Sequence, residues 1–427
     1  MERREGKFCF SFFFVAALRA STNFKSSVIL REEGSRTMEK RKFVIHLDIN
    51  GTIMPADPIR SKHVETMLNI HLSKQAFVRR RDVEDAAMDE IVWWTGSPFL
   101  KGDTPPLLPQ FRYTCHINEH YEEEVFGSTG SYPIGESVSL QDFNAALDGE
   151  KCDDFTCKHS PGHVYEPELV KLLGALEWNH PLLDASITEA LTLEMKDGRK
   201  MNLFVPAFLH LVQYLFEHRD EQDYVLVIRT FGSDIPRLIP AFKLIAQGLH
   251  PDIPTKGCIK EPHAYGSLFR DDTTEFTLQL ESLTHEGERK IVVSSNQAVM
   301  EYFESLESGS VVLICDDYET WKRNKFDPIF GKPIFLDLES AKTCRHFLLD
   351  DNVNTNPKDS IAAVWLKEEG CFRPVPLSSA RGKAMIGTVM LQASLYFAIL
   401  FRDSFVEELQ RANSRYDSLA LRLEKSV

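Results

Sequence analysis

The chain has 427 residues, of which 43% are hydrophobic, and a formal net charge of −14. This length and hydrophobic content are enough for one large domain with an insertion or for two domains. The acidic balance argues against a nucleic-acid backbone as the partner, because binding phosphates along a backbone requires a basic face.

Residues 1–37 form an N-terminal extension that leaves two interpretations open. A charged start followed by an apolar run over 8–18 has the outline of a secretory or organellar targeting segment. The alternative is an extension that the fold does not need, with Met38 as a natural start. Eight scattered cysteines, two of them in or beside apolar strand-like runs, favour a reducing, cytoplasmic compartment over a disulfide framework.

The first strong pattern is an apolar, β-branched run over 43–47, which predicts a strand buried on both faces of a parallel sheet. The run ends at Asp48, so this carboxylate is expected at the carboxyl edge of the sheet, where open α/β sheets place their chemistry. Asn50 and Gly51 follow, and Gly51 permits a sharp turn beside a bound ligand. The pattern Asp-x-Asn-Gly-Thr after a buried strand therefore predicts a functional site.

Residues 80–200 look unlike the rest. A helical spacing over 61–78 leads into a stretch rich in aromatic, proline and acidic residues, which predicts a large insertion directly after the first strand. This stretch also contains zinc-ligand residue types, but their spacing matches no common zinc module, so we interpret them as free cysteines and surface histidines. They are Cys152, Cys157, His159 and His163.

From residue 203 the pattern alternates between helices and strands, which predicts an α/β fold with a doubly wound parallel sheet. Asn202 is expected to cap the first helix, and Pro206 stands in its first turn. The strand over 224–229 ends at Thr230, and Ser233 or Asp234 precedes the next helix. Helices are predicted over 203–218, 236–248 and 297–306, and strands over 224–229, 290–295, 310–315, 345–349 and 361–366, the last of the sheet.

Two of these strands end in paired carboxylates. Oxygen ligands of this kind suit a hard cation such as Mg²⁺. One candidate pair is Asp350 and Asp351, and Lys332, in a Gly-Lys-Pro sequence, lies between the earlier elements and this pair. The alternatives are the pair Asp316 and Asp317 and, for the lysine, Lys322.

These motifs, in this order, resemble those of the haloacid dehalogenase superfamily, over residues 42–58 and 203–370. The resemblance implies that Asp48 is a nucleophile that takes a phosphoryl group. It also implies that Thr230 binds the phosphoryl oxygens, that Lys332 is the motif III lysine, and that the long insertion is a C1-type cap that selects substrates. The family's motif order, with a Gly-Lys-Pro lysine before the acidic pair, favours Asp350 and Asp351 over Asp316 and Asp317. The implied Mg²⁺ ligands are therefore the carboxylates of Asp48, Asp350 and Asp351 and the backbone carbonyl of Asn50.

The departure from the family is Asn50, because the usual motif has a second Asp that protonates the leaving oxygen and then activates water. An amide performs neither transfer, and general acid–base catalysis contributes roughly 10²–10⁴-fold. We therefore expect a slow, Mg²⁺-dependent phosphatase or phosphotransferase acting on a small phosphorylated metabolite. The alternative is a catalytically impaired protein that binds a phosphorylated ligand or partner.

The expected organisation follows from these assignments. An apolar stretch over 384–401 is interpreted as an amphipathic helix covering the sheet and not as a membrane span. The oligomeric state is not readable from the sequence. The predicted parts are an extension over 1–37, a core over 38–58 and 203–375, a cap over 59–202 and a helical segment over 376–427.

Overall fold

The computed structural model describes residues 40–75, 77–80, 91–93, 111–113, 153–158, 163–180, 183–270, 274–283, 290–353 and 360–424. The chain divides into two compact units, Met1–Glu39 and Lys40–Val427. The first unit lies outside the described residues, and the predicted targeting segment over 8–18 lies there too. All that follows concerns the second unit.

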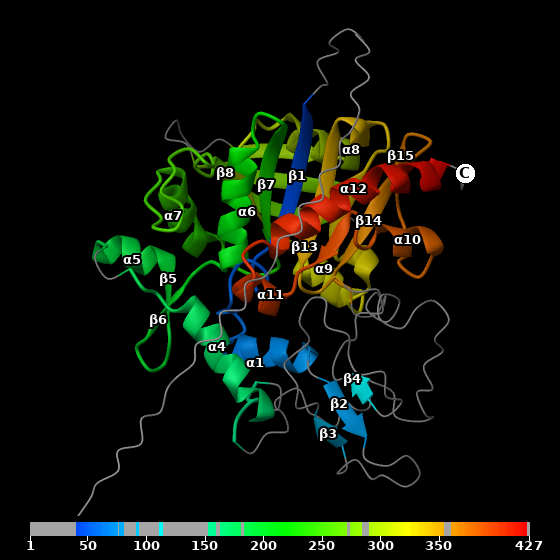
Figure 1. Cartoon of the computed structure of the whole chain (residues 1–427). Coiled ribbons are helices and arrows are strands. Elements are labelled where there is room, and N and C mark those ends of the chain that lie inside the picture. The colour runs from blue at the N-terminus through cyan, green and yellow to red at the C-terminus, as the bar shows by residue number, and fades with distance from the viewer. Residues whose placement is uncertain are drawn as a thin grey trace, which may run out of the picture. The chain divides into compact units, whose positions relative to one another are not determined.

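An eight-stranded sheet forms the centre of this unit (Figure 1), in the order β10-β9-β8-β11-β7-β1-β13-β16. Neighbouring strands from β8 to β16 run parallel, whereas β9 pairs antiparallel with both β8 and β10. The predicted α/β class with a large, mostly parallel sheet is therefore confirmed. The strands are β1 (Arg41–Asp48), β7 (Gln222–Thr230), β8 (Ala264–Arg270), β9 (Phe276–Ser282), β10 (Lys290–Ser294), β11 (Ser310–Asp316), β13 (Cys344–Asp350) and β16 (Met390–Gln392).

Helices cover both faces of the parallel strands. Successive side chains of a strand point to opposite faces, and in β1 Phe43 and Ile45 belong to one apolar cluster whereas Val44 belongs to another. The first cluster takes in the apolar sides of α6, α7, α11 and α12, and the second that of α8. These helices are α6 (Pro206–Glu217), α7 (Ile235–Ala246), α8 (Asn296–Ser305), α11 (Leu395–Leu400) and α12 (Ser404–Glu424).

The direction in which the chain adds strands to the sheet reverses beside β1. From β1 the chain builds the sheet outward on the β7 side, and β13 then lies on the other side of β1. Ligands of open α/β sheets bind outside the carboxyl ends of the strands at such a switch point. The carboxyl ends of β1 and β13, at Asp48 and Asp350, are therefore the expected location of a site.

A second, three-stranded sheet corrects the prediction for residues 361–366. This segment is not the last strand of the large sheet but the centre of the order β12-β14-β15. Residues 249–289, for which no element is predicted, contain β8 and β9. The strands of the smaller sheet are β12 (Lys332–Leu336), β14 (Ala362–Glu368) and β15 (Cys371–Pro374).

The stretch 384–401 is also not one helix. It contains the end of α10 (Ala380–Met385), the edge strand β16 and the short helix α11. Gly387 turns the chain with a φ of 74°, and β16 then pairs with β13, so backbone pairing overrides the helical pattern. Among the described residues, no helix has the length and apolar character needed to cross a membrane.

The described part of the predicted cap packs against the same apolar cluster as the core. Leu173 and Met201 belong to that cluster, together with residues of α6 and α11. Asn202 does not cap α6, because it pairs with Thr192 in a small hairpin; the helix begins at Pro206, after Val205. The helices and strands of this part are α1 (Val64–Gln75), β2 (Phe77–Arg80), β3 (Ile91–Trp93), β4 (Phe111–Tyr113), α4 (Glu166–Leu176), α5 (Ala185–Leu191), β5 (Thr192–Glu194) and β6 (Lys200–Asn202).

Of the four cysteine and histidine residues considered as zinc ligands in this region, Cys157 and His163 are exposed, and Cys157 is a free thiol. Cys152 and His159 lie outside the described residues.

Candidate functional site

The structure brings four of the predicted site residues together at the carboxyl edge of the large sheet. Leu47 pairs with Leu349, so Asp48 and Asp350 end adjacent strands, and Asp351 follows in the next turn. All three carboxylates are buried, and one oxygen of each lies within 4.8 Å of the others. The fourth residue is Lys332, which is completely buried.

The Lys332 ammonium lies between two of these carboxylates. Its Nζ is 2.5 Å from Asp48 Oδ1 and 2.6 Å from Asp350 Oδ2. Lys332 begins β12, and its backbone N–H donates to Ile361 O. The preceding Gly331 is required by this contact, because a Cβ there would lie 2.0 Å from the Ile361 carbonyl oxygen. The Gly-Lys sequence thus brings the amine into the site through close backbone packing.

Electrostatics decide the charge states at this edge. Burial opposes the charged form of Lys332, but the carboxylates of Asp350 and Asp48 raise its pKa, so the ammonium stays charged. Burial raises the pKa of Asp48; Lys332 opposes this shift, while Asp350 and Asp351 add to it. When all three carboxylates are ionised, the single ammonium leaves an excess of two negative charges. A further cation would therefore be stabilised here.

The donor set fits a hard divalent cation. Carboxylate oxygens in a group of three are the ligands that Mg²⁺ prefers, and an ion of charge +2 would neutralise the excess negative charge. The carboxylates of Asp48, Asp350 and Asp351 are the residues that would hold it. The Asn50 backbone carbonyl remains a predicted ligand.

Residues around Asp351 fix its position. Its backbone N–H donates to Thr52 Oγ1 at 3.1 Å, so the threonine of the first motif holds the second acidic segment. His71 of α1 is buried, and its Nε2 is 3.5 Å from Asp351 Oδ2. Gly51 has a φ of 81°, and a Cβ there would lie 2.9 Å from His71 Nε2. A glycine is therefore needed both for the turn and for the approach of the histidine.

Asn50 contacts a carboxylate that the first motif does not contain. Its Nδ2 donates to Asp234 Oδ2 at 2.9 Å, and its Oδ1 is buried without a hydrogen-bond partner in the described part of the chain. Asp234 directly precedes α7 and is 5% exposed. Burial raises the pKa of Asp234, and the hydrogen bond from Asn50 opposes that shift. The amide thus stands beside a buried carboxyl group.

Thr230 ends β7, the neighbour of β1, and is buried. Its Oγ1 accepts a hydrogen bond from Gly232 N at 2.8 Å. Because the oxygen is the acceptor in this bond, the hydroxyl hydrogen remains available for an anionic oxygen.

The alternative residues from the sequence occupy different surroundings. Asp316 is buried and accepts hydrogen bonds from Nε and Nη2 of Arg229, so it is engaged in an ion pair. Asp317 caps α9 (Tyr318–Arg323) by accepting from Thr320 N. Lys322 is exposed on that helix, above the ring of Tyr318. None of the three joins the group around Asp48.

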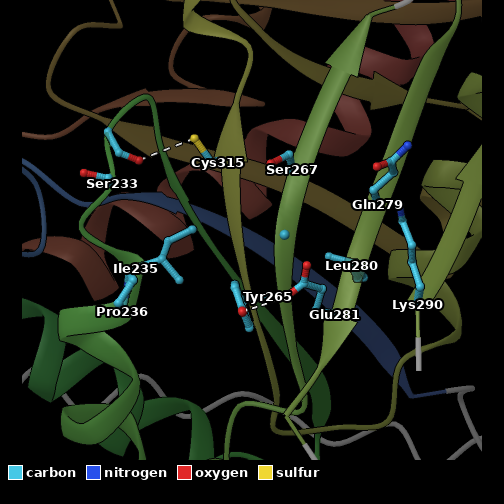
Figure 2. A pocket seen from close by; sticks show the side chains of 12 residues that line it. Ser233, Ile235, Pro236, Tyr265, Ser267, Gln279, Leu280, Glu281, Lys290 and Cys315 are labelled. Atoms are coloured by element: carbon cyan, nitrogen blue, oxygen red, sulfur yellow. Dashed lines mark hydrogen bonds between the residues drawn. The ribbon is translucent and has the colours of Figure 1, made fainter. Parts of the chain in front are cut away.

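A shallow groove of about 340 Å³ lies beside this edge (Figure 2). Figure 2 shows Ser233, Ile235 and Pro236 at the start of α7 on one side of it and side chains of β8 and β9 on the other. Cys315 lies near Ser233, and its thiol donates to Gly232 O. Asp48 and Lys332 do not line the groove, so it is a neighbouring surface and not the site of the carboxylates.

Sequence reasoning did not single out His71 or Arg229. Both lie on predicted elements, but nothing local in the sequence indicates which helical face meets Asp351 or which carboxylate partners the arginine.

Comparisons with family models, with curated proteins and with solved structures found no match to this chain.

Proposed function

We propose that this protein is a Mg²⁺-dependent phosphatase or phosphotransferase that forms an aspartyl phosphate on Asp48, with a core and cap of the haloacid dehalogenase type. The single observation that carries the proposal is the buried group of Asp48, Asp350, Asp351 and Lys332 at the switch point of the sheet. The Asp48 carboxylate can attack phosphorus. The Lys332 ammonium, with a cation held by the carboxylates, would compensate the negative charge of the phosphoryl group.

In the proposed first step, an oxygen of Asp48 attacks the phosphorus of a phosphate ester. A P–O bond to Asp48 forms, the P–O bond to the leaving group breaks, and the departing oxygen takes a proton. In the second step the oxygen of water attacks phosphorus, the bond to Asp48 breaks, and a proton leaves the water. When bound, Mg²⁺ would neutralise charge on the transferring phosphoryl oxygens and on the carboxylates.

The residues around Asp48 have distinct tasks in this scheme. Lys332 fixes the carboxylate by the 2.5 Å contact and contributes positive charge. The Thr230 hydroxyl is oriented by Gly232 N and donates to a phosphoryl oxygen. Asn50 cannot transfer a proton, and Asp234 is the carboxyl group to which its side chain is bound. Asp234 is therefore our candidate for both proton transfers: its carboxyl group gives a proton to the departing oxygen, and its carboxylate then takes the proton that the attacking water loses.

The substrate is proposed to be a small phosphorylated metabolite. The test is phosphate release from a panel of phosphate esters by the full chain, with Mg²⁺ and with EDTA. We expect Mg²⁺-dependent release that is abolished in Asp48→Asn and retained in Asp317→Asn, which changes a helix cap outside the group. Undiminished release from Asp48→Asn would refute the mechanism.

Variants at Asn50 and Asp234 distinguish an enzyme from the alternative, a protein that binds a phosphorylated ligand without turnover. Asn50→Asp should raise the rate by at most the roughly 10²–10⁴-fold that general acid–base catalysis contributes, because Asp234 already supplies part of it. Asp234→Asn should lower the rate of the wild-type chain. Mass spectrometry of the peptide containing Asn50-Gly51 should accompany the assay, because this sequence is prone to deamidation. Absence of phosphate release from both the wild type and Asn50→Asp across the panel would favour the binding protein.

A further inference from the structure

A second group of metal-ligand side chains lies at the opposite end of β13 from Asp350. Cys344 and His346 are two residues apart on this strand and so point to the same face. Glu304, in the last turn of α8, packs over them. One ligand atom from each of the three lies within 4.8 Å of the others. Cys344 and Asp350 are six residues apart, so roughly 20 Å of strand separates this group from the carboxylate site.

The three side chains are partly shielded from water and have few competing partners. Cys344 and His346 are buried, Glu304 is half-buried, and Cys344 is a free thiol. His346 Nε2 is 3.4 Å from Glu304 Oε1, a long contact for a hydrogen bond. The Ser340 hydroxyl donates to the same oxygen. Lys42, the nearby ammonium, donates to backbone carbonyl oxygens at the end of α8 and not to this carboxylate.

A second histidine holds the first in place. His46 of β1 is 3% exposed, its Nε2 is 3.2 Å from His346 Nδ1, and the two rings stack with centroids 5.5 Å apart. His46 Nδ1 is buried and has no hydrogen-bond partner in the part of the chain that is described. An unpaired buried nitrogen is costly and calls for an explanation. The explanation offered by the geometry is that His46 is retained for its bond to His346.

We propose that Glu304, Cys344 and His346 bind a transition-metal dication of the zinc class. A thiolate and an imidazole select such an ion over Mg²⁺, whereas the carboxylate site has only oxygen ligands. In this site His346 Nδ1–H donates to His46 Nε2, so that the lone pair of His346 Nε2 faces the metal. Outer hydrogen bonds of this kind fix the tautomer of metal-bound histidines. His46 is thus a positioning residue.

Binding has a defined proton balance and a structural consequence. The Cys344 thiol loses one proton to solvent as the sulfur–metal bond forms, so the metal affinity rises with pH. Three protein ligands would leave a fourth position for water. The bound ion would link α8 to β13 and stabilise the folded chain. This role does not depend on phosphoryl transfer at Asp48.

The test is a titration of the metal-free full chain with Co²⁺ as a spectroscopic probe. We expect one equivalent to bind with a thiolate-to-cobalt charge-transfer absorption, which Zn²⁺ displaces and Mg²⁺ does not. Cys344→Ser should lose the absorption, whereas Cys258→Ser, at another buried thiol, should keep it. Asp48→Asn should also keep it, so that failure here and failure of the phosphatase proposal are distinguishable.

Two further variants guard against a Cys344→Ser chain that does not fold. In competition with a chromophoric chelator, Glu304→Gln, at a half-buried position, should bind Zn²⁺ at least tenfold more weakly. His46→Gln should lose roughly 10–100-fold, as expected for an outer partner of a metal-bound histidine. Zn²⁺ should raise the melting temperature of the wild type more than that of Glu304→Gln. Absence of binding to the wild type, or equal affinity in Glu304→Gln and the wild type, would overturn the proposal.

Discussion

Replacing Lys332 by Met tests the electrostatic arrangement of the candidate site. The lysine has no exposed surface, and its ammonium compensates Asp48 at 2.5 Å and Asp350 at 2.6 Å. Met retains much of the apolar stem but leaves these buried carboxylates without their cation. Removing one partner of a buried ion pair costs roughly 3–5 kcal/mol, so we expect Lys332→Met to lose about that much unfolding free energy in EDTA.

Mg²⁺ should then act in the opposite direction. With the ammonium gone, the carboxylates of Asp48, Asp350 and Asp351 attract a divalent ion more strongly than in the wild type. At a hundredfold excess over its dissociation constant, a ligand of the folded state adds about 2.7 kcal/mol. Saturating Mg²⁺ should therefore restore a large part of the loss in Lys332→Met.

Urea unfolding followed by tryptophan fluorescence, with EDTA and with Mg²⁺, measures both effects. The matched control is Lys322→Met, because Lys322 is exposed on α9 and its loss should change the unfolding free energy by less than about 0.5 kcal/mol. If Lys332→Met were as stable as this control in EDTA, the buried ion pairs would not have the assigned role. If Mg²⁺ left its stability unchanged, the three carboxylates would not form the proposed metal site.

Three more predictions concern the surroundings of the site and the wider fold. Asp316→Ala leaves the buried Arg229 guanidinium without its carboxylate partner, so it should cost roughly 3–5 kcal/mol in urea unfolding while the stabilisation by Mg²⁺ stays as in the wild type. Gly331→Ala places a Cβ 2.0 Å from Ile361 O and should lose about 1–3 kcal/mol; unchanged stability would contradict the close packing. Burial lowers the pKa of His250 to about 4, so as pH falls from about 6.5 the unfolded chain binds the proton first and stability is lost between about pH 6.5 and 4. His250→Gln should reduce this slope, measured as the unfolding free energy at pH 7 and pH 5, and an equal slope would exclude the histidine as its source.

The sequence by itself determined the elements whose local signals are strong. The apolar run before Asp48 forms β1, and the run before Asp350 forms β13, because a strand buried on both faces needs continuous apolar residues. Pro206 begins α6 because the ring suits the first helical turn and removes an N–H that has no partner there. At such positions the local sequence is enough to indicate the backbone conformation.

Where local signals were weak, pairing partners decided the outcome. The stretch 384–401 has enough apolar residues for a helix, yet part of it forms β16, which pairs with β13 at the edge of the sheet. Residues 361–366 form a strand as predicted, but this strand belongs to the smaller sheet, where it pairs with β12 and β15. A sequence pattern gives the period of the side chains and not the identity of the adjacent strand.

The candidate site shows the same division. The order of the motifs along the chain singled out Asp48, Lys332, Asp350 and Asp351. Asp48 and Asp350 meet because the carboxyl ends of parallel strands share one edge of a sheet, whereas Lys332 reaches them from the start of β12. Only the tertiary structure decided that Asn50 bonds to Asp234, since that contact joins segments 184 residues apart. Such a contact depends on how α7 is placed against the turn after β1, and long-range packing, which no local pattern encodes, fixes that placement.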